Sequence, residues 1–427
     1  MIITSIGALL ILLGLSIPVG IGLGLLGLLL NAMYSPLPLT VMLGEVTWSS
    51  SNSFVLVAVP FYIMLGEIVL RSGIATRMYN ALVKWVSWLP GGLMHSNVAA
   101  CSMFAAISGS SVATAVTIGT VALEEVAKHK YNERLFLGTL AAGGTLGILI
   151  PPSINLVVYG MITETSIPQL YLAGFIPGFT LAGLFSLTVL LACWWRPAWG
   201  GERITASWSD RVRSLPDLLP PIIIFLVVIG SIYAGLATAT ESAALGIICA
   251  LGLAAWFRRL TWTMLMQVFE GTVRTTAVIM LIIIGAYFLN VVINAIGLTG
   301  VIGRYITELN LSSTQLLIAV IVFYLILGCL METLSMMVAT VPITAPLMIK
   351  AGFDPVWYGI LIVLLMETAM LTPPVGINLF VVQGVRGRGR IYDVMVGTAP
   401  FVVTLIAMIA LICVFPQIAL WLPAIAK

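Results

Sequence analysis

Long apolar runs separated by short polar segments make up most of the chain, and this pattern predicts nine membrane-spanning helices. Most runs are long enough to cross a hydrocarbon core of about 30 Å at a rise of about 1.5 Å per residue, with some tilt. The predicted spans are residues 2–30, 54–70, 135–163, 168–195, 218–236, 240–256, 273–296, 356–383 and 395–422. We therefore predict an all-α protein that crosses a lipid bilayer many times.

Two further apolar regions, residues 93–126 and 313–349, are each interrupted by a short segment with polar residues. The first interruption is Ser108-Gly109-Ser110-Ser111, and the second is Met331-Glu332-Thr333-Leu334. A turn at membrane depth is tolerated where it is buried in protein or lines a cavity. We predict that both regions are re-entrant helical hairpins, which enter the membrane and leave it on the same side.

Two of the predicted spans contain a pair of adjacent prolines. Pro151–Pro152 interrupts residues 135–163, and Pro373–Pro374 interrupts residues 356–383. Each pair removes two backbone donors and collides with the carbonyls four residues earlier, so both spans are predicted to be broken helices. In hydrocarbon a carbonyl without a partner costs several kcal/mol, so such a break persists only where it faces a cavity or coordinates a ligand.

The shared layout of the two halves indicates a duplicated chain. The sequence TLGILIPPSINL at 145–156 is matched by TPPVGINLF at 372–380, and Phe61-Tyr62 before the first hairpin is matched by Tyr287-Phe288 before the second. Because the additional span 218–236 separates the halves, they would cross the membrane in opposite directions, as inverted repeats do in many transporters.

The duplication predicts how the chain is divided. We expect the first repeat at residues 1–195, a cytoplasmic linker with a connecting helix at 196–236, and the second repeat at 237–427. Each repeat would contain one re-entrant hairpin and one broken helix.

Composition and charge support a membrane protein and predict its orientation. Hydrophobic residues make up 60% of the chain and charged residues 8%, which leaves no room for a soluble domain. With a cytoplasmic N-terminus and a periplasmic C-terminus, all of the 19 lysines and arginines except Arg304, Lys350 and Lys427 fall on the cytoplasmic side. The net charge of +3 is accounted for by this topology, so no nucleic-acid partner is predicted.

Two amphipathic segments are predicted to lie at the membrane surface. In residues 71–89 the apolar side chains recur at helical spacing, with Trp85 and Trp88 as interfacial anchors. The counterpart in the second half is residues 301–309. The two segments would be arms that hold a moving unit; the alternative is a pair of ordinary connecting helices.

The hairpin tips and the proline breaks together predict two sites for a small hard cation such as Na⁺. Each limb is long enough to reach the middle of the membrane, where hydroxyls of the tip would meet carbonyls of the break. The first site would use Ser108, Ser110, Ser111, Gly147, Ile150 and Pro152, and the second Met331, Thr333, Ala369, Thr372 and Pro374. No carboxylate belongs to the first cluster, which argues against Ca²⁺. The alternative for the Ser108–Ser111 tip is close packing of small residues against a neighbouring helix.

The residues after each break are predicted to bind an anionic substrate. Ser153 and Asn155 begin one half-helix, and Gly376 and Asn378 begin the other. The unpaired N–H groups and the dipole of a helix N-terminus attract negative charge.

Glu332 and Glu367 are carboxyl groups at predicted membrane depth, and such groups are functional-site hypotheses by default. Glu332 lies in the second tip and Glu367 one turn before the second proline pair. Both are candidates for coupling transport to protons or for attracting a cation. The alternative for Glu367 is a pair with a neighbouring side chain.

These motifs resemble the large membrane subunit of tripartite ATP-independent periplasmic (TRAP) transporters along essentially the whole chain. The resemblance lies in the Ser108–Ser111 tip, TLGILIPPSINL at 145–156, TPPVGINLF at 372–380 and TATESAA at 238–244. It implies an elevator architecture like that of the ion-transporter superfamily, and Na⁺-coupled uptake of an organic acid such as a C4-dicarboxylate or sialic acid. It also implies a small four-helix membrane subunit, a periplasmic substrate-binding protein and a place in the bacterial inner membrane.

The sequence favours a secondary transporter over two other classes of membrane protein. An intramembrane enzyme would need a catalytic pair or a metal triad, but His95 and His129 are the only histidines and are separated by the first hairpin. A channel would share the re-entrant segments but would need a wet polar pore. A proton-coupled carboxylate transporter of similar fold remains the alternative to Na⁺ coupling.

Overall fold

The computed structural model describes residues 1–15, 17–126, 129–202, 204, 206–301, 304 and 311–426, and this part of the chain is helical without strands. Six of the described helices are long and apolar enough to cross a membrane, and a seventh span arises if the bent pair α4–α5 counts as one. The helices of the first half are α1 (Ile2–Gly14), α2 (Val19–Tyr34), α3 (Met42–Ser51), α4 (Ala58–Arg71), α5 (Ile74–Val86), α6 (Gly92–Ser108), α7 (Ser111–Val126), α8 (Glu133–Thr145), α9 (Ile154–Thr163) and α10 (Ile167–Trp195). The later helices are α11 (Trp208–Ser214), α12 (Leu219–Tyr233), α13 (Ala239–Trp256), α14 (Trp262–Ala295), α16 (Ser313–Gly328), α17 (Thr333–Lys350), α18 (Pro355–Leu371), α19 (Ile377–Arg386), α20 (Ile391–Val414) and α21 (Gln417–Ile425).

The first apolar run is two helices, so the prediction of a single span at residues 2–30 is wrong. The chain turns between α1 and α2, and Thr4 Oγ1 lies 2.7 Å from the hydroxyl of Tyr34, which brings the start of α1 to the end of α2. Pro18 explains the turn, because it has no N–H to donate and disfavours a helical conformation at Ile17. Residues 1 and 34 therefore lie at the same end of the pair.

The last apolar run also differs from the prediction of one span at 395–422. α20 ends at Val414, and α21 begins after Pro416 and packs on α10. Pro416 lacks the N–H that would continue α20. The span predicted at 273–296 is part of a longer helix, α14, which begins at Trp262.

Both regions predicted as hairpins form pairs of helices joined by a short turn. Gly109 makes the turn between α6 and α7 with φ +60°, which favours glycine because it has no Cβ. The base of the second hairpin is closed by a hydrogen bond from Ser313 Oγ to the carbonyl of Ala351 at 3.0 Å. Each pair of helices therefore returns to the end from which it starts.

Both proline pairs interrupt helices as predicted from their chemistry. Pro151–Pro152 separates α8 from α9, and Pro373–Pro374 separates α18 from α19. Both Pro–Pro peptide bonds are cis.

The two halves pack through matching pairs of helices. α7 packs against α19 and α17 against α9, so the second limb of each hairpin contacts the second half-helix of the other half. The side-chain amides of Asn378 and Asn155 mirror this crossing, because Asn378 Nδ2 donates to the carbonyl of Ala141 at 3.1 Å and Asn155 Nδ2 lies 3.9 Å from Met366 Sδ. Such reciprocal packing is what a duplicated chain would produce, while the opposite orientation of the repeats in a membrane stays a prediction.

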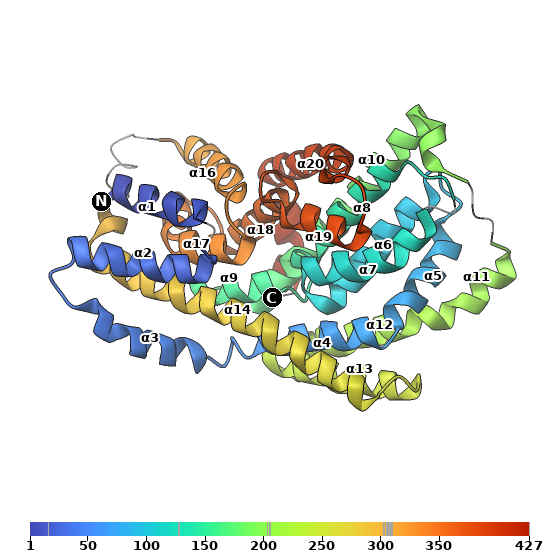
Figure 1. Ribbon diagram of the computed structural model, residues 1–427, viewed down its shortest axis with the longest axis horizontal. Coiled ribbons are helices and arrows are strands. Elements are labelled where there is room, and N and C mark those ends of the chain that lie inside the picture. The colour runs from blue at the N-terminus through green and yellow to red at the C-terminus, as the bar shows by residue number, and fades with distance from the viewer. Residues whose placement is uncertain are drawn as a thin grey trace.

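Four helices form a layer along one side of the hairpins and broken helices. α2, α14, α4 and α13 pack on one another along the lower side of Figure 1, and the hairpins and broken helices lie above them. We call α2, α4, α13 and α14 the scaffold layer. α5 leaves α4 at a bend of 66° and buries Ile74 and Met78. Of the second predicted arm, 301–309, only residues 301 and 304 are described.

Candidate functional site

A cavity of about 460 Å³ lies between the two hairpin tips and the scaffold layer. One wall holds both tips together with Asn155 and the ends of the broken helices, and the other holds residues of α4 and α14. Its lining includes the polar and charged side chains of Glu67, Ser111, Asn155, Arg274 and Glu332, together with Val112. The volume lies within the range of about 300–1,000 Å³ that small-molecule sites occupy.

Four helices begin at this cavity. Their first residues are Ser111 of α7, Ile154 of α9, Thr333 of α17 and Ile377 of α19, and all four line it. Each N-terminus carries roughly half a positive charge and N–H groups without helical partners. The ends of α7, α9 and α19 have no acidic residue in their first turn and favour an anionic ligand, whereas the end of α17 is capped by Glu332.

The first tip is in direct contact with the first break. The N–H of Ile154 donates to the carbonyl of Gly109 at 3.4 Å, and a Cβ on Gly147 would lie only 2.5 Å from the carbonyl oxygen of Ser110. A Cβ on Gly109 would lie 2.7 Å from the carbonyl oxygen of Pro152, so this carbonyl faces the tip. The structure thus brings Ser110, Gly147 and Pro152 together.

Hydroxyl groups of the first tip are arranged around its backbone. Thr114 Oγ1 donates to the carbonyl of Ser110 at 2.7 Å and lies 3.1 Å from Ser108 Oγ. The Ser111 hydroxyl makes no hydrogen bond within the described residues, although Ser111 is only 5% exposed. A hydroxyl that lines the cavity without a protein partner is free to bind a ligand, and a cation would use it. Ile150 differs from these residues, because its side chain packs toward Gly178 of α10.

The second tip also contacts the second break. The N–H of Val375 donates to the carbonyl of Cys329 at 3.4 Å, and Gly328 packs directly on Ala369. Thr372 Oγ1 donates to the carbonyl of Thr368 at 2.7 Å. Pro374 is exposed, whereas every residue from 149 to 153 at the first break is buried. The two clusters therefore differ in how deeply they are buried.

Glu332 caps a helix at the tip of the second hairpin, beside Met331 and Thr333. Its carboxylate accepts from the Ser335 N–H at 3.0 Å, from Ser335 Oγ at 3.1 Å and from Thr333 Oγ1 at 3.0 Å. It stabilises the N-terminus of α17 and offsets the positive end of that helix.

The four predicted substrate-binding residues fall in different environments. Asn155 lines the cavity. The Ser153 hydroxyl caps α9, donating to the carbonyl of Ile148 at 2.5 Å and accepting from the Leu156 N–H at 3.3 Å. Gly376 precedes α19 with φ +33°, and Asn378 is buried against α8. Sequence reasoning missed the scaffold wall, where Glu67 and Arg274 are the charged residues.

Glu367 is fully buried in α18, and neither carboxylate oxygen has a hydrogen-bond partner in the described part of the chain. A buried carboxylate without a partner would cost many kcal/mol if it were ionised. It is therefore neutral, or it is paired with a cation.

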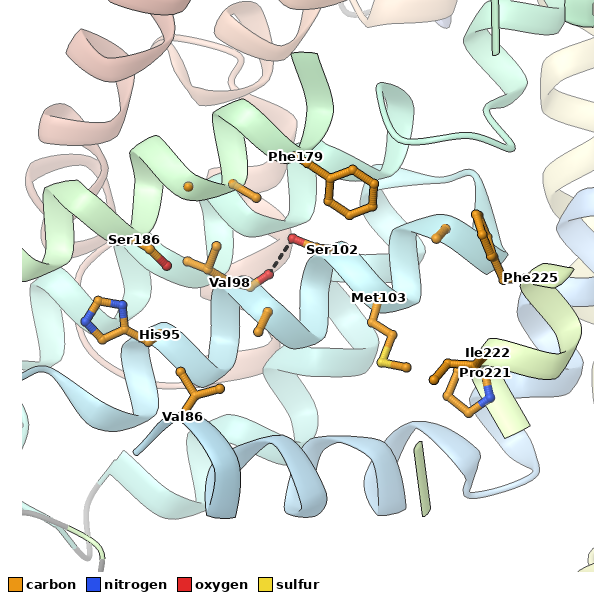
Figure 2. A pocket seen from close by; sticks show the side chains of 14 residues that line it. Val86, His95, Val98, Ser102, Met103, Phe179, Ser186, Pro221, Ile222 and Phe225 are labelled. Carbon is orange, nitrogen blue, oxygen red and sulfur yellow. Dashed lines mark hydrogen bonds between the residues drawn. The ribbon is translucent and has the colours of Figure 1, made fainter. Parts of the chain in front are cut away.

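A second cavity of about 440 Å³ lies between α6, α10, α12 and the end of α5 (Figure 2). It is lined mainly by apolar side chains, and its polar groups are largely engaged. Ser102 Oγ donates to the carbonyl of Val98 at 2.8 Å, and His95 Nε2 lies 2.9 Å from the carbonyl of Pro90. This cavity therefore offers few free polar groups that could orient a charged substrate.

Helical hairpins whose tips meet broken helices around one cavity define a secondary membrane transporter as the class of protein. Residues 6–418 match the family described as "Tripartite ATP-independent periplasmic transporter, DctM component", and the chain belongs to this family. The prediction of the large TRAP membrane subunit is thereby confirmed, and the chain is a multi-pass membrane protein.

Similar proteins are named for different substrates. The chain is 33% identical to the C4-dicarboxylate TRAP transporter large permease protein DctM of Rhodobacter capsulatus, covering 97% of this chain and 96% of that protein. It is 31% identical to the sialic acid TRAP transporter large permease protein SiaM of Vibrio cholerae, covering 87% of each. It is 30% identical to the ectoine TRAP transporter large permease protein TeaC of Halomonas elongata, covering 87% and 86%.

A solved structure supports the fold. The YdaH transporter of Alcanivorax borkumensis superimposes with a TM-score of 0.60 over 94% of this chain and 96% of that chain, at 14% sequence identity. At this identity the likeness concerns the fold alone.

Proposed function

We propose that this protein is the large permease subunit of a Na⁺-coupled symporter that imports a small organic acid. The observation that carries the proposal is the convergence of four helix N-termini, three of them without an acidic cap, on one cavity of about 460 Å³. A C4-dicarboxylate, sialic acid or a related carboxylate suits this site. We place the protein in the bacterial inner membrane with a small four-helix membrane subunit, and a periplasmic binding protein delivers the substrate.

Na⁺ coupling is supported by the contact between each tip and its break. At the first site, Ser111 and the carbonyls that face the tip fit a small hard cation, which would draw the tip and the break together. Ser108, Ser110, Gly147 and Pro152 would contribute with it. Proton coupling is the second candidate, because Glu367 is a buried carboxyl without a partner in the described residues.

Uptake by the assembled transporter in proteoliposomes tests the function. We expect concentrative and saturable uptake of a C4-dicarboxylate or sialic acid when Na⁺ is higher outside, because the helix N-termini supply an anion site and the tips a cation site. A pH gradient without Na⁺ is the control. Uptake driven by the pH gradient alone would contradict Na⁺ coupling and favour Glu367, while flux without concentration would indicate a channel.

The same assay tests the proposed elevator movement, in which the hairpins and broken helices slide past the scaffold layer. Cysteines replacing Val86 of α5 and Val98 of α6, which line one cavity in Figure 2, would be joined by a short bismaleimide. Uptake should stop, because the hairpin is then fixed to the arm. A linker between Ser313 and Ala351, within one hairpin, is the control and should be tolerated. Full uptake with α5 linked to α6 would exclude an elevator.

The pair α1–α2 leads to a revised orientation. A single span at 2–30 with a cytoplasmic residue 1 would put the segment after residue 34 outside, but residues 1 and 34 lie at the same end of the α1–α2 pair. With the basic loops kept inside, we propose that residue 1 and the C-terminal end both lie outside. Single cysteines at Phe353 and Ser313 should then react with a membrane-impermeant thiol reagent from outside, and one at Gly387 should not. Labelling of Phe353 and Ser313 from opposite sides would refute the re-entrant hairpin.

A further inference from the structure

The cavity has one wall that the motifs did not reveal, formed by the scaffold helices α4 and α14. Ile63, Gly66, Glu67 and Leu70 lie on one face of α4, and Arg274, Thr275, Val278, Ile279 and Ile282 on one face of α14. This wall is apolar toward one end and charged toward the other. Its charged residues are Glu67 and Arg274.

The two carboxylates that line the cavity have partners of their own. Glu67 Oε2 accepts from Arg71 Nε at 3.0 Å, and Arg71 also donates to Gln267 Oε1 at 3.0 Å, which ties α4 to α14. Glu67 also lies against Gly271, where a Cβ would come within 2.7 Å of its carboxyl carbon. Glu332 is held as the cap of α17. Neither carboxylate is therefore a ready partner for Arg274.

Arg274 is the one cation among the described residues that line the cavity. Its nearest carboxylate is Glu270 on the same helix, with NH2 of Arg274 4.0 Å from Oε1 of Glu270, and the two side chains are 81% and 73% exposed. Exposed i,i+4 pairs at such distances contribute little. The guanidinium is therefore available to a ligand in the cavity.

We propose that Arg274 is the scaffold-side group that sets the anion preference of the cavity and contacts the acidic group of the substrate. This rests on the proposed function, in which the substrate is an organic acid. A guanidinium binds a carboxylate or a sulfonate through two parallel hydrogen bonds, which an ammonium group cannot do. The helix N-termini act on the substrate from the opposite wall, so the anion is held between the two units that move relative to each other.

Reaction rates of charged thiol reagents test Arg274 without a known substrate. Val112 lines the cavity and is 39% exposed, so a cysteine replacing it, in a chain lacking the five native cysteines, reports the local potential. The rates with anionic methanethiosulfonate ethylsulfonate and with its cationic trimethylammonium analogue are compared at low salt. We expect Arg274→Gln to lower the ratio of anionic to cationic rates about threefold or more, because a nearby positive charge is lost.

Two variants control the measurement. Arg274→Lys keeps the charge and should keep the ratio, and Arg259→Gln removes one charge from the loop between α13 and α14, away from the cavity lining. Equal ratios in Arg274→Gln and Arg259→Gln would overturn the proposal. This measurement needs no transport, so its outcome is independent of the uptake assay. If the unaltered transporter shows no Na⁺-driven uptake, the proposed function is refuted, but the effect of Arg274 on the electrostatic potential of the cavity is not.

Discussion

Gly397→Ala is expected to prevent α20 from packing on α8 and to destabilise the protein by about 3 kcal/mol or more, at the upper end of overpacking effects. A Cβ on Gly397 would overlap the carbonyl oxygen of Arg134, and Gly138 on the facing helix is equally crowded by the carbonyl of Gly397. The atoms in the way are backbone, so they cannot rotate aside as a side chain would. Thermal unfolding in detergent, followed with a thiol-reactive dye that reports exposure of the native cysteines, measures the loss.

Gly252→Ala on α13 is the matched control. Nothing lies within 4 Å of its added Cβ, so the change should be neutral or stabilise the helix by up to about 1 kcal/mol. Equal melting temperatures for the two variants would show that α8 and α20 do not approach as closely as described.

Gly147→Ala is expected to raise the Na⁺ concentration needed for half-maximal uptake. The added Cβ would lie 2.5 Å from the Ser110 carbonyl oxygen, whereas ordinary contact begins at 3.4 Å, so the tip must withdraw by about 0.9 Å (3.4 − 2.5). Ligand distances in a cation site tolerate only about 0.2 Å. Losing one ligand costs about 1–3 kcal/mol, which raises the Na⁺ concentration for half-maximal uptake about 5- to 150-fold.

Two companion variants make the result specific to the site. Ser111→Ala removes the unpartnered hydroxyl of the tip and should shift the Na⁺ dependence in the same direction. Gly183→Ala on α10 adds the same methyl group where nothing lies within 4 Å and should leave it unchanged. An unaltered Na⁺ dependence in well-folded Gly147→Ala and Ser111→Ala variants would show that the first tip does not bind the coupling Na⁺.

Prediction of the helices depended on how local their signals are. Runs of apolar residues and tandem prolines act on their own segment of backbone, so α10, α12 and both breaks could be placed from the chain alone. The turn at Pro18 was missed because both α1 and α2 are apolar, and an apolar run of 29 residues fits one span as well as two short helices. The contact between Thr4 and Tyr34 comes from packing and has no local signal.

For the candidate site, too, the features with a local signal in the sequence differ from those that depend on packing. The sequence by itself determined the tips and the breaks, because prolines, glycines and hydroxyls at membrane depth have few structural uses outside a site. Only the tertiary structure decided that Ser153 is engaged as a cap, that the first break is buried while Pro374 is exposed, and that Arg274 faces the same cavity as Ser111. The physical reason is that these properties depend on which face of each helix meets a partner distant in the chain. α14 carries polar residues on more than one face, and only its packing against α4 selects the face that lines the cavity.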